Sequence, residues 1–317
     1  MAATTLGSRA IIGRFYQALE QDAGAGWVDL VSMLFTSDQA SETYAWLGQS
    51  PAMREWIGGR HAKGFRENGI TLINKKFEAT LEVPLDWLRR DKTGQLQVRI
   101  NELAQRTNAH WAKLLSALII AGESTACYDG QYFFDTDHSE GDSGTQSNDI
   151  SVDISALPVP ATAHGSTTAP APEELMHAIL EGAQQILSFK DDQGEPMNEA
   201  ARQFAVMVPV PYWKSALAAV GAPTLAQGAT NIITQADGFG FRIFTNPRLT
   251  WTTKFALFRA DGGTAPFIRQ EEEGVMMDAL AEGSEEEFKH DRHLYGVKAL
   301  RNVGYGYWQK ACLVTLT

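Results

Sequence analysis

A serine that could act as a nucleophile is Ser143, which stands in the string Gly-Asp-Ser-Gly at 141–144. The same four residues surround the nucleophile of many serine hydrolases, where a packed scaffold holds a base and an oxyanion hole in place. Here the string lies in a polar loop, residues 140–148, without a strand pattern on either side. We therefore interpret Ser143 as a loop residue and keep a serine hydrolase as an alternative.

A second set of residues that could do chemistry is the cluster Asp135, Asp137 and His138, and a similar His and Asp group occupies residues 290–293. Carboxylate and imidazole side chains at such spacing can bind a divalent metal ion. Neither group has the histidine pair of a zinc-protease helix or the pattern of an EF-hand loop. We favour turns whose carboxylates accept backbone hydrogen bonds, with a metal-dependent enzyme as the alternative.

Few other residues are candidates for reactivity or cofactor binding. Cys127 and Cys312 have no Cys-x-x-Cys partner and no nearby histidine in the sequence, which favours two buried, reduced thiols. The glutamate runs 271–273 and 285–287 are typical of a solvated surface, or of a subunit boundary where they pair with basic residues of a neighbour. With no phosphate-binding glycine loop in the chain, we predict no cofactor and no bound metal.

The charge balance limits the class of partner. The 317 residues include 27 basic and 38 acidic side chains, for a formal net charge of −11. Such a surface repels phosphate backbones and disfavours sequence-specific nucleic-acid binding, but it is compatible with the wall of a DNA container. No apolar run approaches the ~20 residues of a membrane span, and residues 1–13 lack the apolar core of a secretory signal.

Helical periodicity predicts helices in two regions of the first half of the chain. Residues 1–50 contain two short amphipathic stretches with a glycine break, as in an arm that packs on another surface. Residues 96–121 have apolar side chains at steps of three and four, with Asp91 or Thr93 as the candidate N-cap and Gly122 as the end. A helix of that length, ~39 Å, is expected to form the spine of a domain.

Between these helices, residues 56–83 have the pattern of an extended hairpin. Asn68-Gly69 predicts a two-residue type I′ turn, because both residues tolerate positive φ. The alternation of apolar and polar residues shifts phase at 74–76, which indicates a bulge or bend. Because the first arm of this hairpin is polar, we expect it to project from the domain and rest on a neighbouring subunit.

The second half alternates helices and strands after a loop at 139–172 that is rich in Ser, Thr, Gly and Pro. Pro172 begins the next predicted helix, since proline suits the first helical turn. We then predict a strand and a helix, two further strands, an acidic loop that holds the two glutamate runs, and a last strand: 205–210, 212–220, 231–234, 239–245, 271–287 and 311–316. The result is a mixed α+β fold.

Two long and specific strings occur at 44–58 and at 127–135, the second followed by His138. Shorter strings follow in order along the chain, at 74–78, 192–197, 208–209 and 304–308. Together they resemble the major head (major capsid) proteins of Mu-like tailed bacteriophages and prophages.

The resemblance implies an HK97-like (Hong Kong 97-type) major capsid fold of the α+β class. Such a fold has an N-terminal arm, an extended loop (E-loop), a peripheral (P) domain built on a long spine helix, and an axial (A) domain. The corresponding segments of this chain are 1–50 for the arm, 51–90 for the E-loop region, 91–170 and 262–317 for the P domain, and 171–261 for the A domain.

The function that the resemblance implies is that of a structural protein and not an enzyme, the major capsid protein of a tailed double-stranded DNA phage. Copies would assemble in the host cytoplasm into the hexamers and pentamers of an icosahedral head, which becomes part of the virion and encloses the genome without sequence-specific binding or a membrane. A scaffold protein, a portal and a decoration protein are the expected further partners. The overlapping arm and E-loop would contact adjacent subunits through Phe15, Trp27, Trp56, Phe65, Asn68, Gly69 and Phe77.

Three alternatives stay open. An enzyme would use Ser143 or the cluster Asp135, Asp137 and His138. A shell of the same fold could package protein cargo in place of DNA. A phage structural protein of another kind, such as a decoration or tail subunit, fits less well with the chain length and with the order of hairpin and long helix.

Overall fold

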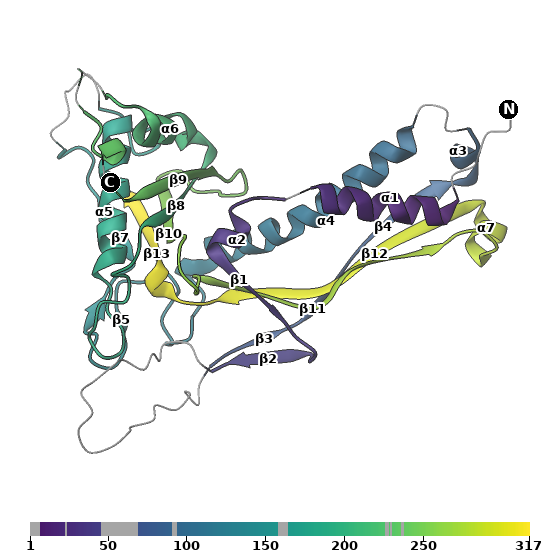
Figure 1. Ribbon diagram of the computed structural model, residues 1–317, viewed down its shortest axis with the longest axis horizontal. Helices are drawn as coiled ribbons and strands as arrows, with labels where there is room; N and C mark the ends of the chain where they lie inside the picture. The colour runs from purple at the N-terminus through teal and green to yellow at the C-terminus, as the bar shows by residue number, and fades with distance from the viewer. Residues whose placement is uncertain are drawn as a thin grey trace, which may run out of the picture.

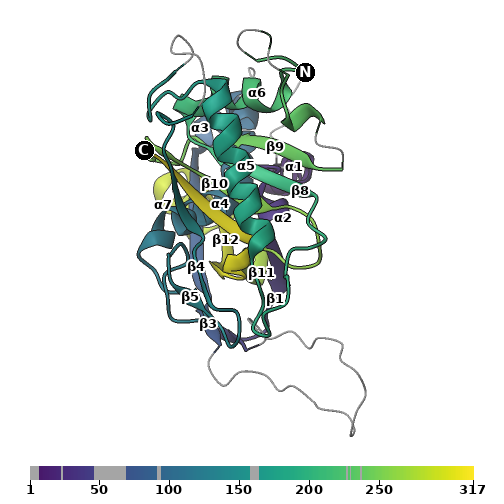
Figure 2. The same ribbon diagram turned by 90° about the vertical axis from the view of Figure 1, so that its left-hand side faces the viewer.

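The computed structural model describes residues 7–22, 24–45, 69–90, 94–157, 164–225, 228, 230–235 and 238–317. These residues form an elongated body and a compact body, which meet at one end of the elongated sheet (Figure 1). In the view turned by 90°, the compact body faces the viewer with helix α5 (Pro172–Ser188) in front (Figure 2).

The elongated body is built on a four-stranded sheet with the strand order β1-β11-β12-β4. Its longest members, β11 (Phe267–Leu280) and β12 (Arg292–Tyr305), form an antiparallel hairpin with the short helix α7 (Glu285–His290) at its tip. β4 (Lys75–Pro84) pairs antiparallel with β12, and β1 (Ser32–Thr36) pairs parallel with β11. Along β12, buried and half-buried side chains alternate, as expected of a sheet with one covered face.

The long helix α4 (Gln95–Ile120) lies along this sheet and confirms the predicted spine helix. It begins after Gly94, whose φ of 74° is left-handed, and continues into a 3-10 turn, η1 (Ala121–Glu123). The candidate N-caps Asp91 and Thr93 lie outside the described residues. The buried side chains of α4 recur at helical spacing: Leu96, Ile100, Ala104, Thr107, Ala112, Leu115, Ser116 and Ile119.

The two predicted N-terminal helices are present as α1 (Ser8–Gln21) and α2 (Val28–Val31). α1 packs along α4 of the same chain, and distant residues satisfy backbone groups at both of its ends. The carboxylate of Glu282 accepts a hydrogen bond from the backbone N–H of Ser8 (2.8 Å), and the Asn108 amide donates to two carbonyls at the C-terminal end (2.8 and 2.9 Å). The helical part of the arm therefore packs on its own subunit.

The compact body contains a five-stranded sheet in which parallel and antiparallel pairs are mixed. Helix α5 covers one face of it, and α6 (Trp213–Gly221) packs against α5 and against one edge strand. β8 carries a continuous apolar run because both of its faces are buried. In order across the sheet, the strands are β7 (Asp149–Val152), β13 (Ala311–Leu316), β10 (Lys254–Arg259), β8 (Gln203–Val208) and β9 (Gly240–Thr245).

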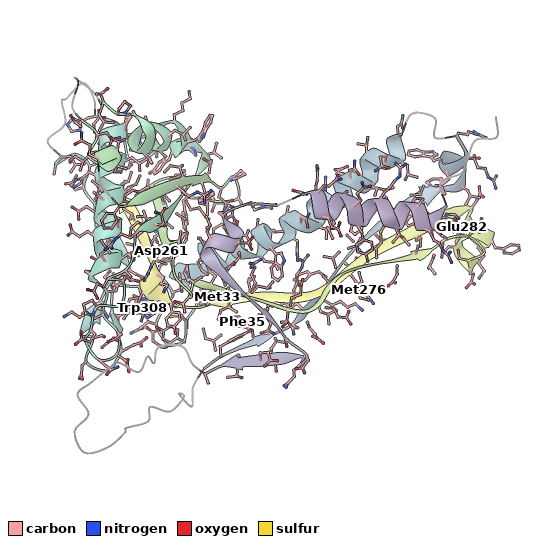
Figure 3. All side chains as sticks on the ribbon, viewed as in Figure 1. Met33, Phe35, Asp261, Met276, Glu282 and Trp308 are labelled. Atoms are coloured by element: carbon pink, nitrogen blue, oxygen red, sulfur yellow. The ribbon has the colours of Figure 1, made fainter. Side chains whose placement is uncertain are left out.

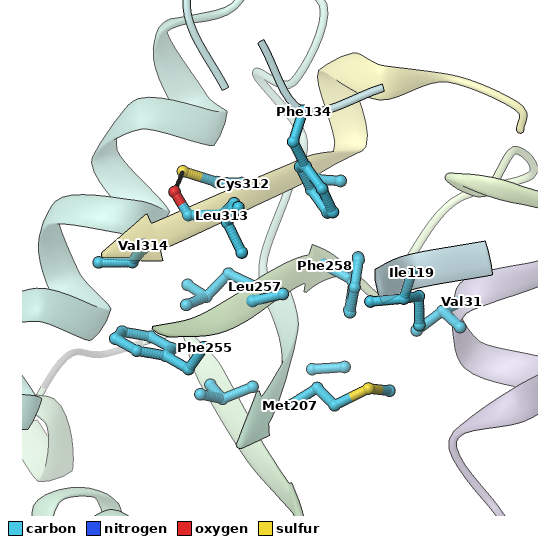
Figure 4. Close-up of a cluster of buried hydrophobic side chains, with 14 of the residues drawn as sticks. Val31, Ile119, Phe134, Met207, Phe255, Leu257, Phe258, Cys312, Leu313 and Val314 are labelled. Atoms are coloured by element: carbon cyan, nitrogen blue, oxygen red, sulfur yellow. Dashed lines mark hydrogen bonds between the residues drawn. The ribbon is translucent and has the colours of Figure 1, made fainter. Parts of the chain in front are cut away.

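One hydrophobic core runs through the junction of the two bodies. Figure 4 shows Ile119 of α4 and Val31 of α2 beside Phe258 of β10, and Phe134 approaching β13 from a loop. All four side chains are almost completely buried. The bodies are therefore joined by packing as well as by the chain itself.

The first arm of the hairpin predicted at 56–83 lies outside the described residues, and the strands of its second arm pair with other segments. β3 (Ile70–Ile73) pairs antiparallel with β2 (Ser41–Tyr44), and β4 leaves this ribbon to join the four-stranded sheet. Gly69 lacks the positive φ of a type I′ turn, and a Cβ there would lie 2.6 Å from the carbonyl oxygen of Tyr44. The predicted bend is confirmed, since Asn74 separates β3 from β4.

Two further local predictions are wrong. Residues 231–234 form no strand, because the buried Asn231 donates to the carbonyls of Ala219 (2.7 Å) and Ala222 (2.8 Å) at the end of α6, and a 3-10 turn (Ile233–Gln235) follows. The glutamate runs do not share a loop, because Glu271–Glu273 belong to β11 and Glu285–Glu287 to α7. In both cases, contacts with residues distant in the sequence determine the local structure more than the local composition does.

Sheet membership also differs from the expected segment boundaries. β7 and β13 fall within the segments 91–170 and 262–317 that we assigned to the P domain, but they hydrogen-bond into the five-stranded sheet of the compact body. β4 falls within the expected E-loop region, 51–90, yet it belongs to the four-stranded sheet. The chain therefore crosses between the two bodies more often than its linear pattern indicates.

Gly122 provides a test of the packing at the end of α4. A Cβ at this position would lie 2.6 Å from the Phe134 ring, whereas a Cβ at the exposed Gly13 in α1 would meet nothing within 4 Å. We expect Gly122→Ala to lower the free energy of unfolding by about 1–3 kcal/mol through overpacking. Gly13→Ala should be neutral or raise it, by up to about 1 kcal/mol. Equal effects in urea denaturation would contradict this account.

Candidate functional site

Ser143 lies in a closed turn. Its hydroxyl accepts a hydrogen bond from the backbone N–H of Glu140 (3.0 Å) and donates to the carbonyl of Gly144 (2.9 Å), while its own N–H donates to the Glu140 carbonyl (2.9 Å). The side chain is buried. A serine held in this way stabilises a loop, and the geometry does not favour a nucleophile.

The structure does not bring the predicted cluster of Asp135, Asp137 and His138 together around one point. The Asp135 carboxylate accepts backbone hydrogen bonds from Tyr132 (3.1 Å) and Thr136 (2.8 Å), which is the favoured turn arrangement. Asp137 is exposed, and His138 is buried with its Nδ1 directed at another carboxylate. This part of the alternative is therefore not supported by the geometry.

A different cluster forms instead from Cys127, Asp129 and His138. The thiol of Cys127 donates to Oδ1 of Asp129 (2.9 Å), and Nδ1 of His138 lies 2.6 Å from Oδ2 of the same carboxylate. The His138 ring stacks on the indole of Trp308 with a centroid distance of 4.0 Å. Cys127 and Asp129 reach this point through a tight turn in which Gly130 has a φ of 93°.

The electrostatics of the cluster oppose metal binding and nucleophilic chemistry. Burial next to Asp129 raises the pKa of the Cys127 thiol well above its usual range, so the thiolate that a metal or an electrophile requires is disfavoured. Burial alone would raise the pKa of Asp129, but hydrogen bonds from His138 and Cys127 outweigh it, and that pKa is lowered. The cluster is therefore an ionised carboxylate with two donors.

Sequence reasoning missed this cluster because it searched for a histidine close to Cys127. His138 is eleven positions further along the chain, and the turn at Asp129 and Gly130 is what brings the two side chains together. The available signal was the specific string at 127–135 followed by His138, which carries three of the participating groups in one block.

Further buried polar side chains surround the segment after β12. The Asn198 amide donates to the carbonyls of Ile186 and Gln309 (both 2.7 Å), and the Asn148 amide donates to the carbonyl of Phe133 (2.7 Å). The hydroxyl of Tyr128 donates to the side chain of Gln309 (3.0 Å). The two bonds to Gln309, together with a longer one from the Asn148 amide to the Trp308 carbonyl (3.4 Å), hold the short 3-10 turn η5 (Trp308–Lys310), which connects the two sheets.

Large apolar side chains are exposed on both bodies. Phe288, at the tip of the β11–β12 hairpin, is 92% exposed, and Ile73 in the β2–β3 ribbon is 62% exposed. The others among the large exposed side chains are Leu34, Trp87, Val98, Tyr132, Val210, Trp213, Leu217, Ile232, Met276 and Leu280. Among the described residues, none of the helices combines the length and apolar character that crossing a bilayer requires.

The residues predicted to contact neighbouring subunits have different surroundings. Phe15 and Trp27 are buried within the subunit itself, in the cores beside α4. Gly69 packs closely against the backbone of Tyr44, and Phe77 is half-buried. The other three, Trp56, Phe65 and Asn68, lie outside the described residues. A contact role for these seven residues stays a prediction, and intramolecular packing accounts for the side chains of Phe15 and Trp27.

Phe77 lines a basic groove of about 230 Å³ between α4, β4 and β12, where its ring meets that of His110 edge-on at 4.4 Å. Burial, together with the nearby charges of Arg301, Lys113 and Arg248, lowers the pKa of His110 to about 4. Because this lies below the ordinary value of 6.5, the unfolded chain binds the proton more readily than the folded one. The stability that depends on neutral His110 is therefore lost as the pH falls from 6.5 towards 4.

We expect His110→Gln to reduce this loss of stability by roughly 1 kcal/mol at pH 5, a value below the full linkage energy because solvent screens a half-buried group. Urea denaturation of unassembled subunits at pH 7 and pH 5 measures the effect. His177→Gln, at a surface position of α5, is the matched control. If both variants keep the pH dependence of the parent, another group is responsible for it.

The buried cluster makes a separate prediction. Asp129→Ala leaves the Cys127 thiol and the His138 imidazole without their acceptor, and we expect it to lower the free energy of unfolding by about 2–4 kcal/mol. Asp137→Ala removes an exposed carboxylate nearby and should change it by less than about 0.5 kcal/mol. Thermal unfolding of the two variants distinguishes a stabilising cluster from surface charge, since equal shifts would contradict the role given to Asp129.

Comparison with known families gives one extensive match. The chain matches the family described as Mu-like prophage major head subunit gpT over residues 8–157 and 244–316, which together make up more than half of its length. These two stretches include α1, α4, the four-stranded sheet, the cluster around Asp129 and the strand β13.

Two curated relatives are similar to part of the chain. It is 38% identical over 122 residues to the Mu-like prophage FluMu major head subunit of Haemophilus influenzae, covering 38% of this chain and 40% of that one. It is 32% identical over 108 residues to the major capsid protein of Escherichia phage Mu, covering 34% and 35%. Both alignments thus span less than half of the curated relatives.

Among solved structures, a subunit of the procapsid of bacteriophage JBD30 covers 96% of this chain and 72% of its own, with a TM-score of 0.55 and 24% identity. At that identity the likeness establishes the fold alone. The predicted HK97-like capsid fold is thereby confirmed.

Proposed function

The chain belongs to the Mu-like prophage major head subunit family, and on that premise we propose that it is the major capsid protein of a tailed double-stranded DNA phage. Copies of it assemble into hexamers and pentamers of an icosahedral head, with a scaffold protein, a portal and a decoration protein as further partners. The shell forms in the host cytoplasm and becomes part of the virion. The family match, which extends over both bodies of the fold, is the observation that carries the proposal.

The elements of the structure suggest revised domain boundaries for this proposal. We assign α1 and α2 to the arm, the β2–β3 ribbon to the base of the E-loop, and α4 with the four-stranded sheet to the P domain. The A domain then comprises the five-stranded sheet with α5 and α6, and it includes β7 and β13. Each strand is thus assigned with the partners to which it hydrogen-bonds.

The β2–β3 ribbon supports a role for the E-loop in contacts between subunits. A two-stranded ribbon is marginally stable alone. This one is held to its own chain by the buried side chains of Tyr44 and Leu72 and by hydrogen bonds from β11 and β12. Ile73 projects from it with 62% exposure. A neighbouring subunit that covers Ile73 would bury this apolar surface and stabilise the ribbon.

The net charge of −11 argues against a sequence-specific DNA-binding protein, because it disfavours tight contact with phosphates, and it is compatible with a container for DNA. A shell of the same fold that packages protein cargo differs in one measurable property. Particles isolated from infected or induced cells should contain double-stranded DNA, detected by absorbance at 260 nm after nuclease treatment.

Replacing the tip of the β2–β3 ribbon tests the proposal. Tyr44 pairs with Ile70, so residues 46–68 can be exchanged for a short Asn-Gly turn while the paired strands are retained. We expect the full chain, produced with its scaffold protein, to form closed shells in negative-stain electron microscopy, and the shortened chain to stay unassembled with an unchanged melting temperature. Small monodisperse particles from the full chain would contradict a capsid function, and shells from the shortened chain would contradict the role of this segment.

A further inference from the structure

The far end of the elongated body carries two apolar features that the described part of the chain leaves exposed. One is helix α7 at the tip of the β11–β12 hairpin, and the other is a groove beside the helix α3 (Leu85–Arg90) and the start of α4. Figure 1 shows α3 and α7 at the same end, and Figure 3 shows Glu282 there, at the opposite end from Trp308. Both features are part of the same chain, so every copy of the subunit offers both.

Helix α7, which carries Phe288, is held in place by a side-chain cap and an ion pair. Ser284 caps the helix by accepting a hydrogen bond from the N–H of Glu287 (3.2 Å), and Arg292 of β12 pairs with Glu286 (3.0 Å). None of the α7 residues is buried, and Phe288 is 92% exposed. The side chain therefore contributes nothing to the core of its own subunit, and its surface is available to a partner.

The groove has a volume of about 440 Å³, and its lining is mainly apolar. Trp87, which is 57% exposed, forms one wall, and the other apolar lining residues are Leu81, Val83, Pro84 and Leu96. A phenyl side chain fits a site of this size and character. Phe288 does not fill the groove of its own chain, since it is almost completely exposed.

Charged side chains of both signs lie near the groove, and the arginines are the more numerous. Arg99 lines the groove together with Glu82, and Arg89 and Arg90 are exposed on the adjoining helix α3 beside Asp86, whereas α7 begins with Glu285, Glu286 and Glu287. Among the described residues, Arg90 and Arg99 pair with the exposed Asp86 and Glu102 of their own helices, at 3.5 Å each, and such pairs are weak. Opposite charge at the rim of an apolar contact fixes its orientation and accelerates association.

We propose that α7 of one subunit docks in the α3–α4 groove of a second copy, with Phe288 inserted beside Trp87 and the α7 glutamates facing the arginines at the rim. The inference rests on the proposed capsid function and specifies one of its contacts. The contact is heterologous, since a different surface of each copy takes part, and such contacts close into a ring when the rotation between copies divides the circle. Three copies joined through this end would form a threefold junction.

Disulfide trapping between two variants tests the contact. Trp87→Cys and Phe288→Cys are made in separate full-length chains, mixed in equal amounts, assembled with the scaffold protein and oxidised. The native Cys127 and Cys312 are buried and so do not compete. We expect a linked dimer in shells from the mixture and none in shells from either variant alone.

Each other outcome overturns the inference. Shells without a linked dimer exclude the contact but leave the capsid function intact. A dimer from Phe288→Cys alone indicates a symmetric contact between two tips, and a linked product from Trp87→Cys alone indicates that the groove holds some other segment. If the parent chain, carrying neither substitution, forms no shells with the scaffold protein, the proposed function is contradicted, and this inference with it.

A second measurement uses the exposure of Phe288, because replacing it leaves the core untouched. We expect Phe288→Ser to raise the subunit concentration for half-maximal assembly about tenfold, as for loss of an interface anchor. Phe288→Leu, the matched control, keeps an apolar side chain and should stay within about threefold of the parent. Equal effects of the two variants, at unchanged melting temperatures, would overturn the insertion of this side chain.

Discussion

Burial of the Trp308 side chain is the interaction on which the arrangement of the two bodies depends. β12 leaves the elongated sheet at Tyr305 and β13 enters the compact sheet at Ala311, so the turn between them sets the relation of the bodies. The indole stacks on His138 at 4.0 Å and meets the Phe189 ring edge-on at 5.3 Å. Loss of a buried tryptophan typically costs about 3–5 kcal/mol, enough to make this turn a fixed joint.

Polar groups around this joint make it directional. Asp129 orients His138 beneath the indole, and the amides of Asn148 and Asn198 donate to the carbonyls of Trp308 (3.4 Å) and Gln309 (2.7 Å) within η5. Apolar packing alone tolerates small rotations, whereas satisfied buried hydrogen bonds permit few. A subunit whose two bodies are held in this way loses little conformational freedom on assembly, and that lowers the free-energy cost of building a shell from many copies.

Exposure distinguishes the aromatic residues that pack within the subunit from those that we propose to contact another subunit. Phe15 and Trp27 have the periodicity of contact residues in an arm, yet they lie in the cores beside α4. The sequence pattern does not predict Trp87 or Phe288 as contact residues, but both side chains are exposed at the far end of the elongated body. Residue type alone does not distinguish the two cases, because an aromatic side chain is equally suited to a core and to an interface.

By itself, the sequence determined the elements whose pattern is local and the family to which the chain belongs. The spine helix, α5, α6 and the last strand follow from periodicity and proline placement, since these depend on residues a few positions apart. Only the tertiary structure decided that β3 pairs with β2, that β7 and β13 join the compact sheet, and that Cys127, Asp129 and His138 meet. Those outcomes depend on residues distant in the chain, whose pairing is set by burial and hydrogen bonding that no local pattern records.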